Sequence, residues 1–304
     1  MMDVRYTKMW WLVVGAVGLR VFNAMPFNRE NELLDVRVME LGHVVDAFIL
    51  VECRYTQFGT PKPIRYVPHP SPKVHHFIME WRPKRGQRGC KLGWILERKQ
   101  RDYIIQTLAV IPHDPHDILI INDADEIPSS SLVQRLRDNP PAWGTEYPIH
   151  MERYLYNFGW LEPQHSQMAG VARIDTWKRW KFDSIRPIHG RPIPNGGWHC
   201  TKCFNHYEFN ARFKDYLCGD GARWGDYEWT NYTIGAMLAH GIWPGNTPDA
   251  PRPESVDAMQ HAPRGAWRYP HLVYPHQPDP GPIQMPYCRG HHRDMNRLVT
   301  AWCH

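Results

Sequence analysis

The sequence predicts an α/β protein with a Rossmann-like, mostly parallel sheet. Short apolar runs alternate with segments whose apolar residues recur at helical spacing, which is typical of β-α-β units. The chain has 304 residues, 42% of them apolar and 22% charged, a composition typical of a globular protein with a substantial core. In such sheets ligands bind at the carboxyl ends of the strands, so polar residues at those ends are the first candidates for function.

The predicted elements follow one another in the order that a helix-covered sheet requires. Residues 30–45 are predicted to form a helix because Leu34, Val38 and Leu41 recur on one face. A second helix is expected over residues 96–110, and strands are expected over residues 21–27, 47–51, 74–79 and 118–121. Because helices separate most of these strands, neighbouring strands are expected to run parallel.

The stretch "ILIINDADEIP", residues 118–128, takes an apolar run into three carboxylates. In an extended backbone Asp123 and Asp125 point to one side while Ala124 points to the other. Such oxygens are the ligands that Mg²⁺ or Mn²⁺ prefers, and these ions keep positions for water and substrate phosphates. We therefore predict that Asp123 and Asp125 hold one divalent cation. Pro128 is expected to open a helix, with Glu126 as a charge partner of its first turn.

Two classes of enzyme place such a pair after a strand. Phosphatases of the haloacid dehalogenase type use the first aspartate, here Asp123, as a nucleophile, and residues 219–226 are similar to their later acidic loop. In these phosphatases Thr or Val normally follows the second aspartate by two positions, where this chain has Ile127. Their motif also normally lies near the N-terminus. Nucleotide-sugar glycosyltransferases use the pair to hold a metal on the donor diphosphate, and they place it further into the domain. The position favours the transferase.

Several longer stretches occur in one order over roughly residues 20–245. They are "NELLDVRVMELGHVVDAFILVE" (31–52), "GTPKPIRY" (59–66), "DADEIP" (123–128), "GGWHCTKCF" (196–204) and "RWGDYE" (223–228). Together they resemble glycosyltransferase family 17, the family of the bisecting N-acetylglucosaminyltransferase. The chain departs from that family in having Thr201 and Lys202 where Ser-Trp is usual, and in largely lacking the membrane anchor and stem.

The resemblance implies a metal-dependent transfer of N-acetylglucosamine from UDP-N-acetylglucosamine to a mannose hydroxyl of an N-glycan, in β-1,4 linkage and with inversion. A cation on the aspartate pair would neutralise the departing UDP, while a carboxylate across the site removes the acceptor proton. No covalent sugar intermediate is required. A third interpretation, besides transferase and phosphatase, is a glycan-binding module that uses the 14 Trp and 14 Tyr without turnover.

Two further stretches supply candidate contacts. Arg101 is a candidate for the donor phosphates, with Glu97 beside it, and the alternative is a solvated helix face with a Glu97–Arg101 pair at i, i+4. His199 is a candidate for the metal site or the substrate. Cys200 and Cys203 are expected to form a structural or disulfide element rather than a zinc knuckle, because no second cysteine pair stands at finger spacing.

Three acidic residues compete for the role of base. Asp226 precedes a helical apolar face and suits an N-cap, whose hydrogen bonds lower its basicity. Asp220 has no such structural role and is flanked by glycines, which allow close approach of the acceptor. We therefore rank Asp220 first, Asp226 second and Glu228 third.

The two ends of the chain differ from its middle. Residues 1–19 carry an apolar run that suits a signal or short anchor as well as a buried first segment, and the first alternative implies the secretory pathway, the Golgi membrane and association through the N-terminus. Residues 20–243 are expected to form the catalytic domain. Residues 244–304, with 11 prolines between Pro244 and Pro286, are expected to wrap over the core, with Trp267 and Tyr269 docking them.

The charge pattern excludes one class of partner. The net charge is +5, but the 36 basic residues are scattered and include no run of five. A nucleic-acid-binding stripe is therefore not expected.

Overall fold

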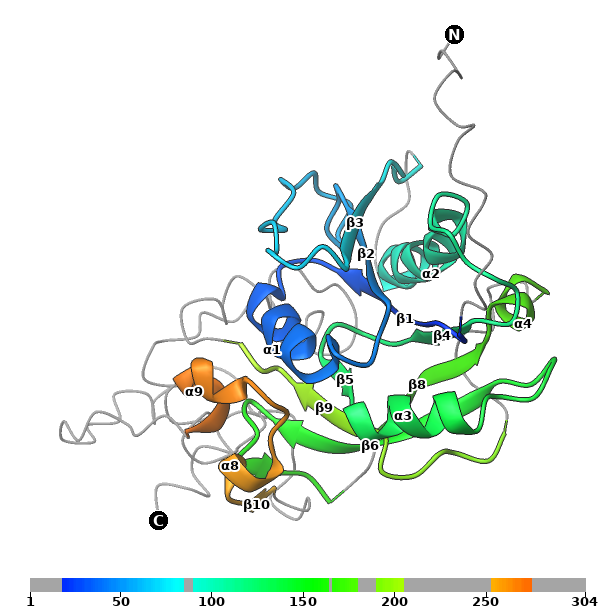
Figure 1. Ribbon diagram of the computed structural model, residues 1–304. Helices are drawn as coiled ribbons and strands as arrows, with labels where there is room; N and C mark the ends of the chain where they lie inside the picture. The colour runs from blue at the N-terminus through cyan, green and yellow to red at the C-terminus, as the bar shows by residue number, and fades with distance from the viewer. Residues whose placement is uncertain (1–17, 85–89, 164–165, 180–189, 205–252, 275–304) are drawn as a thin grey trace, which may run out of the picture.

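The computed structural model describes residues 18–84, 90–163, 166–179, 190–204 and 253–274 (Figure 1). Most of its strands join one sheet in the order β10-β7-β6-β8-β4-β1-β2-β3, and two further strands, β5 and β9, pair with each other beside β6. The α/β class predicted from the sequence is confirmed.

The strands at one end of this order are parallel. β1 (Val21–Phe27) lies between β2 (Ala47–Cys53) and β4 (Ile118–Ile121), and β3 (Val74–Met79) pairs with β2 at the edge. Every residue of β2 and β4 is buried, because both faces of the sheet are covered. The carboxyl ends of these strands therefore meet at one edge of the sheet.

Helices cover both faces of the parallel strands. On one face α1 (Asn31–Leu41) and α3 (Ser130–Asp138) pack through Leu34, Leu41 and Leu132 against alternate residues of β1. On the other face α2 (Cys90–Thr107) and α4 (Ile174–Arg179) pack through Leu96 and Trp177. Figure 1 shows α1 and α2 on opposite sides of β1 and β2.

The other end of the sheet is antiparallel, which corrects the expectation of a mostly parallel sheet to a mixed one. β8 (Ser166–Arg173) pairs antiparallel with β4, β6 (Tyr147–Leu155) with β8, and β7 (Trp160–Leu161) with β6. β5 (Glu126–Pro128) and β9 (Gly197–Thr201) pair with each other, and β9 also runs parallel to β6. None of these strand pairings was predicted.

The predicted boundaries hold for β1, β3 and β4 and shift elsewhere. α1 ends at Leu41 rather than at residue 45, because the chain turns at Gly42 and the amides of Val44 and Val45 both bond the carbonyl of Leu41. α2 begins at Cys90 and ends at Thr107, so it starts earlier and stops earlier than predicted. The predicted helix after Pro128 is found as α3, but Pro128 itself ends the preceding strand. Ser129 is the N-cap of α3 and accepts from the amide of Leu132 (3.1 Å).

Part of the predicted C-terminal extension is described. It contains β10 (Glu254–Ser255), α8 (Ala258–His261), η2 (Ala266–Arg268) and α9 (Pro270–Val273), and Leu272 and Val273 are buried beside Leu33 and Val36 of α1. Tyr269 binds α1 through a hydrogen bond to Asp35 (3.1 Å), as a docking residue should. Trp267 is 58% exposed, so its predicted docking role is wrong.

The predicted signal or anchor falls mainly on residues 1–17, outside the described residues. Among the residues that the structure describes, no helix combines the length and the apolar character needed to cross a membrane.

Candidate active site

The carboxyl ends of β1, β2 and β4 are joined by two consecutive residues of α2. Gln100 donates through Nε2 to the carbonyl oxygens of Phe27 in β1 (3.5 Å) and Val51 in β2 (3.1 Å). Its neighbour Arg101 donates through Nη2 to Oδ1 of Asp123 (2.7 Å), two residues beyond β4. Hydrogen bonds from α2 therefore tie together the carboxyl ends of β1, β2 and β4.

Residues 123–126, which we call the acidic turn, do not continue the strand. The amide of Glu126 donates to the carbonyl of Asp123 (3.1 Å), and the amide of Asp123 donates to Oε2 of Glu126 (2.8 Å). The expectation of an extended backbone at the two aspartates is wrong, because the hydrogen bond from the amide of Glu126 to the carbonyl of Asp123 closes a turn here. Glu126 is also not in the first turn of a helix: it begins β5 and is fully buried.

A buried arginine on α1 holds the acidic turn by its carbonyl oxygens. Nη2 of Arg37 donates to the carbonyls of Asp123 (2.9 Å), Ala124 (2.9 Å) and Glu126 (2.7 Å). Nη1 donates to Oδ1 of Asn23 in β1 (2.8 Å). These contacts involve the backbone of the turn, so they do not depend on the carboxylates of Asp123 and Asp125.

Two buried asparagines complete this network. Nδ2 of Asn23 donates to Oδ1 of Asn122 (2.9 Å), and Nδ2 of Asn122 donates to the carbonyl of Glu126. Burial lowers the pKa of Arg37 to about 10, against the opposing effect of the nearby carboxylates led by Glu126. Arg37 therefore stays charged at neutral pH, which strengthens its hydrogen bonds to the carbonyls.

Asp123 is paired with Arg101, which is itself buried. The second terminal nitrogen of Arg101 lies 3.6 Å from Oε2 of Glu97, the i, i+4 partner considered from the sequence. The helix face is thus not solvated, since Arg101 is only 7% exposed. Burial lowers the pKa of Arg101, but the charges of Asp123 and Glu97 outweigh burial and leave that pKa raised. The direct partner of this guanidinium is Asp123, so its predicted contact with donor phosphates stays a prediction.

His199 lies beside the acidic turn because β9 pairs with β5, with His199 opposite Glu126. Its Nε2 is 3.6 Å from Oδ2 of Asp125, and its Nδ1 is 4.0 Å from Oε1 of Glu126. Burial lowers the pKa of His199, but the charges of Asp125, Glu126 and Asp123 outweigh it and raise that pKa above its ordinary value. His199 therefore carries positive charge toward the carboxylates over a wider pH range than an exposed histidine.

The residues around His199 fix the approach of β9 to the acidic turn. Gly197 has φ 140°, and a Cβ there would collide with the carbonyl of Ile127, so the pairing of β9 with β5 requires glycine at this position. The amide of Cys200 donates to the carbonyl of Asp125 (2.8 Å). Cys200 and Cys203 form a disulfide, so the predicted disulfide is found and these two sulfurs are not zinc ligands.

Asp123 and Asp125 remain the oxygen ligands available for a cation. Their side chains are 31% and 29% exposed, at the sheet edge. Within the described ranges, no group of three or more His, Cys, Asp or Glu side chains is arranged to hold a metal ion. A pair of half-exposed carboxylates still fits Mg²⁺ or Mn²⁺ bound together with substrate phosphates, because such ions take one or two protein carboxylates and fill their other positions with phosphate and water.

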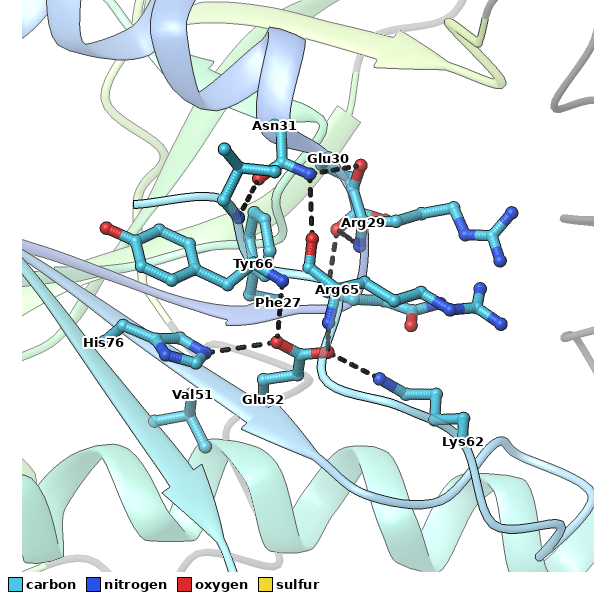
Figure 2. A network of polar contacts seen from close by, with 12 residues as sticks. Phe27, Arg29, Glu30, Asn31, Val51, Glu52, Lys62, Arg65, Tyr66 and His76 are labelled. Atoms are coloured by element: carbon cyan, nitrogen blue, oxygen red, sulfur yellow. Dashed lines mark hydrogen bonds and ion pairs between the residues drawn. The ribbon is translucent and has the colours of Figure 1, made fainter. Parts of the chain in front are cut away.

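A second buried carboxylate organises the neighbouring strand end (Figure 2). Glu52, at the end of β2, is fully buried and accepts hydrogen bonds at both oxygens. Oε1 accepts from Nζ of Lys62 (2.7 Å) and the amide of Arg65 (2.8 Å). Oε2 accepts from the amide of Tyr66 (3.2 Å) and lies 3.1 Å from Nε2 of His76. Glu52 thus fixes the loop that carries the motif "GTPKPIRY".

Sequence reasoning did not identify Arg37, Asn23 or Glu52 as parts of the site. Each carries a signal that could have been used. Arg37 stands on the apolar face of a helix, three and four residues after Leu34 and Leu33, and Asn23 and Glu52 interrupt apolar strands. A polar residue on a buried face requires a partner, which at a strand end is a reason to suspect a site.

The three candidate bases, Asp220, Asp226 and Glu228, lie outside the described residues, as does the acidic loop that suggested a phosphatase.

The chain is similar to a known family and to curated proteins. The model of glycosyltransferase family 17 matches residues 8–239. The human and rat proteins named beta-1,4-mannosyl-glycoprotein 4-beta-N-acetylglucosaminyltransferase are each 30% identical to this chain, in matches that cover 83% of it. The matches cover 54% and 53% of those proteins, so the chain spans about half the length of the curated relatives it matches.

One solved structure has a weak similarity to this chain in its fold. It is the 4-diphosphocytidyl-2C-methyl-D-erythritol synthase of Anaerococcus prevotii, which matches with 10% identity over 65% of this chain and 97% of its own. Its TM-score of 0.31 is too low to support a conclusion.

Proposed function

Because this chain belongs to glycosyltransferase family 17, we propose that it transfers N-acetylglucosamine from UDP-N-acetylglucosamine to a mannose hydroxyl of an N-glycan, in β-1,4 linkage and with inversion. The names of the human and rat relatives support the sugar and the acceptor class. The observation that carries the proposal is the acidic turn, whose two half-exposed aspartates stand at the carboxyl end of β4 inside the matched range. Ligands of open α/β sheets bind at this edge.

In this proposal Asp123 and Asp125 hold Mg²⁺ or Mn²⁺, which supplies positive charge to the diphosphate leaving group. Arg101 orients Asp123 through its 2.7 Å hydrogen bond, and His199 faces Asp125 at 3.6 Å. Arg101 and His199 therefore position the two aspartates, and the aspartates bind the donor through the metal ion. Arg37 keeps the backbone of the turn in place while these contacts form.

The transfer itself requires a base on the acceptor side. A carboxylate of the enzyme takes the proton of the acceptor hydroxyl. The hydroxyl oxygen then bonds to the anomeric carbon of the donor sugar, while the bond from that carbon to the diphosphate oxygen breaks. We keep Asp220 as the first candidate, Asp226 as the second and Glu228 as the third. The change of Asp220 to Asn should reduce transfer by a factor on the order of 10² or more and leave donor binding near normal.

The other two interpretations make different predictions. A phosphatase would hydrolyse simple phosphomonoesters through Asp123, whereas a transferase releases UDP only from a nucleotide sugar. A glycan-binding module would bind the acceptor and release no UDP. Membership in the family favours the transferase.

The test is a UDP-release assay with UDP-sugars and Mn²⁺, followed by glycan analysis of the product. Asp125→Asn should abolish Mn²⁺-dependent donor binding while the thermal unfolding curve stays near that of the wild type. Asp138→Asn, an exposed change at the end of α3, is the matched control and should retain release. Unchanged donor affinity in Asp125→Asn would contradict the metal role.

We also propose that the protein works in the secretory pathway, at the Golgi membrane. The support is the apolar run from Met9 to Leu19 together with N-glycans as the proposed acceptors. Fusion of residues 1–30 to a cytosolic reporter should direct the reporter into that pathway. A diffuse cytosolic reporter would contradict the proposal.

A further inference from the structure

Four charged residues form a row across the strands beside the acidic turn. His199 in β9 lies opposite Glu126 of β5 on one side and opposite Arg153 of β6 on the other. Glu162 directly follows β7, and its amide donates to the carbonyl of Arg153 (2.7 Å), which continues the antiparallel pairing of β7 with β6. Figure 1 shows β5, β9 and β6 side by side. We call these four residues the charge row.

The side chains of the charge row lie on one face of these strands. Residues that stand opposite one another in neighbouring strands point to the same side. Nδ1 of His199 is 4.0 Å from Oε1 of Glu126, and Nε of Arg153 is 2.7 Å from Oε2 of Glu162. The charge of His199 also acts on the carboxyl of Glu162. The opposite face is part of a buried apolar cluster, which includes Ile127, Tyr154 and Cys200.

The charge row begins at the acidic turn. Nε2 of His199 is 3.6 Å from Oδ2 of Asp125, one of the two proposed metal ligands. Neighbouring strands lie about 4.8 Å apart, so Arg153, two strands away from Glu126, is separated from it by about 10 Å. A sugar bonded to a diphosphate at Asp125, and the acceptor that attacks this sugar, both fall within the span of the row.

Arg153 keeps donors that the fold does not use. Its Nε faces Glu162, and within the described ranges no hydrogen bond or ion pair engages its two terminal nitrogens. Its side chain is 33% exposed, so these nitrogens are accessible to a ligand. The arginines on the other side of the acidic turn differ, because Arg37 binds carbonyl oxygens and Arg101 binds Asp123.

Glu162 is incompletely satisfied by the protein. Its Oε2 is buried and has no hydrogen-bond donor among the described residues, since the contact with Nε of Arg153 is an ion pair without hydrogen-bond geometry. Burial raises the pKa of Glu162, and the charges of Arg153 and His199 oppose this rise without cancelling it. A buried carboxylate that lacks donors is stabilised by each hydroxyl that a ligand brings to it.

We propose that Arg153 and Glu162 bind neighbouring hydroxyl groups of a sugar ring at the reaction centre, either the ring of the donor or that of the acceptor. A hydroxyl group both donates and accepts, so it can donate to the carboxylate and accept from the guanidinium fork. A phosphate fits less well, because the carboxylate repels an anion. The inference rests on the proposed transfer from a nucleotide sugar to a glycan and adds residues that recognise the sugar.

The experiment uses Mn²⁺ buffer and measures binding of UDP and UDP-N-acetylglucosamine by titration calorimetry, together with KM for an N-glycan acceptor. The variants are Glu162→Gln, Arg153→Gln and Arg153→Lys, the last of which keeps the ion pair with Glu162 and loses the fork. Asp46→Asn is the matched control. Asp46 also pairs with an arginine, Arg137 (2.6 Å), but it stands just before β2, at the opposite edge of the sheet.

The two sources of the sugar ring give different results. If the ring belongs to the donor, Glu162→Gln and Arg153→Gln should each weaken UDP-N-acetylglucosamine binding about tenfold and leave UDP binding unchanged. If it belongs to the acceptor, both nucleotide affinities stay the same and KM for the acceptor rises about tenfold. Arg153→Lys should retain part of the lost affinity in either case.

Two results overturn the sugar contact and leave the proposed transferase standing. In the first, the Gln variants match Asp46→Asn in both UDP-N-acetylglucosamine affinity and acceptor KM. In the second, UDP and UDP-N-acetylglucosamine are lost in parallel, which would show that the pair acts on the metal and diphosphate.

Other results separate the sugar contact from the proposed donor. Binding of a different UDP-sugar that depends on Glu162 supports the contact and overturns UDP-N-acetylglucosamine as donor. A wild-type protein that binds no UDP-sugar also overturns the proposed donor. The affinity of the same variants for the glycan then tests the pair, and an affinity equal to that of Asp46→Asn overturns the sugar contact as well.

Discussion

The acidic turn and the Glu52 loop use buried charge in opposite ways. Glu52 receives donors at both carboxylate oxygens from Lys62, His76 and two backbone amides, so its charge is used entirely to fix a loop. In the acidic turn, Arg37 fixes the loop by its carbonyls. The aspartates beside it stay about 30% exposed. The comparison shows how one sheet edge carries both a fully buried structural carboxylate and carboxylates that stay accessible to solvent.

The largest effect is expected from removing Arg37. Arg37→Met leaves three turn carbonyls and Asn23 without their donor in a buried place, so we expect a loss of about 3–5 kcal/mol in the free energy of unfolding. Urea denaturation measures this loss. Arg54→Met, which breaks an exposed pair with Glu80, should change the same quantity by less than about 0.5 kcal/mol. Similar values for the two variants would contradict the role assigned to Arg37.

The second effect concerns Glu52. Burial raises the pKa of Glu52, but the hydrogen bonds from His76 and Lys62 outweigh burial and hold that pKa below its ordinary value. Glu52→Gln should therefore cost about 2–3 kcal/mol at pH 7, because Lys62 is left as a buried charge.

The pH dependence of the Glu52 effect has a definite sign. A carboxyl whose folded pKa is lowered stabilises the protein above its unfolded pKa, about 4.3, and this stabilisation is lost as pH falls through the folded pKa. The difference between wild type and Glu52→Gln should thus shrink below about pH 4. Denaturation curves at pH 7, 5 and 3.5 measure it, and a constant difference would show that the carboxylate charge is not what stabilises the loop.

A smaller effect of opposite sign is expected from His199 in metal-free buffer. Its pKa is raised in the folded protein, so its stabilisation is fully present below the unfolded pKa of about 6.5 and is lost as pH rises through the folded pKa. The gap in unfolding free energy between wild type and His199→Gln should therefore narrow from pH 6 to pH 9. A gap that widens over this range would mean that His199 does not act through the carboxylates.

The smallest change in stability is expected from Asp125→Asn. The side chain is half exposed and Arg37 holds the turn by other atoms, so the free energy of unfolding should change by no more than about 0.5 kcal/mol. Thermal or urea unfolding of the metal-free protein measures it. A loss comparable to that of Glu52→Gln would remove the distinction between the two carboxylate regions.

The parallel strands could be predicted from the sequence because their local pattern is strong. β2 and β4 are apolar throughout and are buried on both faces. β6 was missed because Glu152 and Arg153 interrupt its apolar pattern, and its partners β8 and β9 follow later in the chain. Antiparallel pairing of this kind is decided by tertiary contacts, which a local pattern does not contain.

The site could be predicted only where its residues are neighbours in the chain. Asp123 and Asp125 form a short Asp-x-Asp motif that can be recognised directly after an apolar strand. His199 belongs to the motif "GGWHCTKCF", which is rich in residues that can bind ligands. Arg37 lies 86 residues from the carbonyl of Asp123 that it binds, and Asn23 lies 99 residues from Asn122. Contacts over such separations depend on the completed sheet, so no spacing rule indicates them.

The contact between Arg37 and the turn carbonyls has a consequence for protein engineering. A carbonyl oxygen is present whatever side chain a residue carries, so the hydrogen bonds from Arg37 to the carbonyls of residues 123, 124 and 126 do not depend on the amino acids placed in the turn. A library that varies position 125 therefore samples ligand chemistry on a constant backbone. Position 123 is different, because its carboxylate also pairs with the buried Arg101, so variants there need a parallel selection for folding.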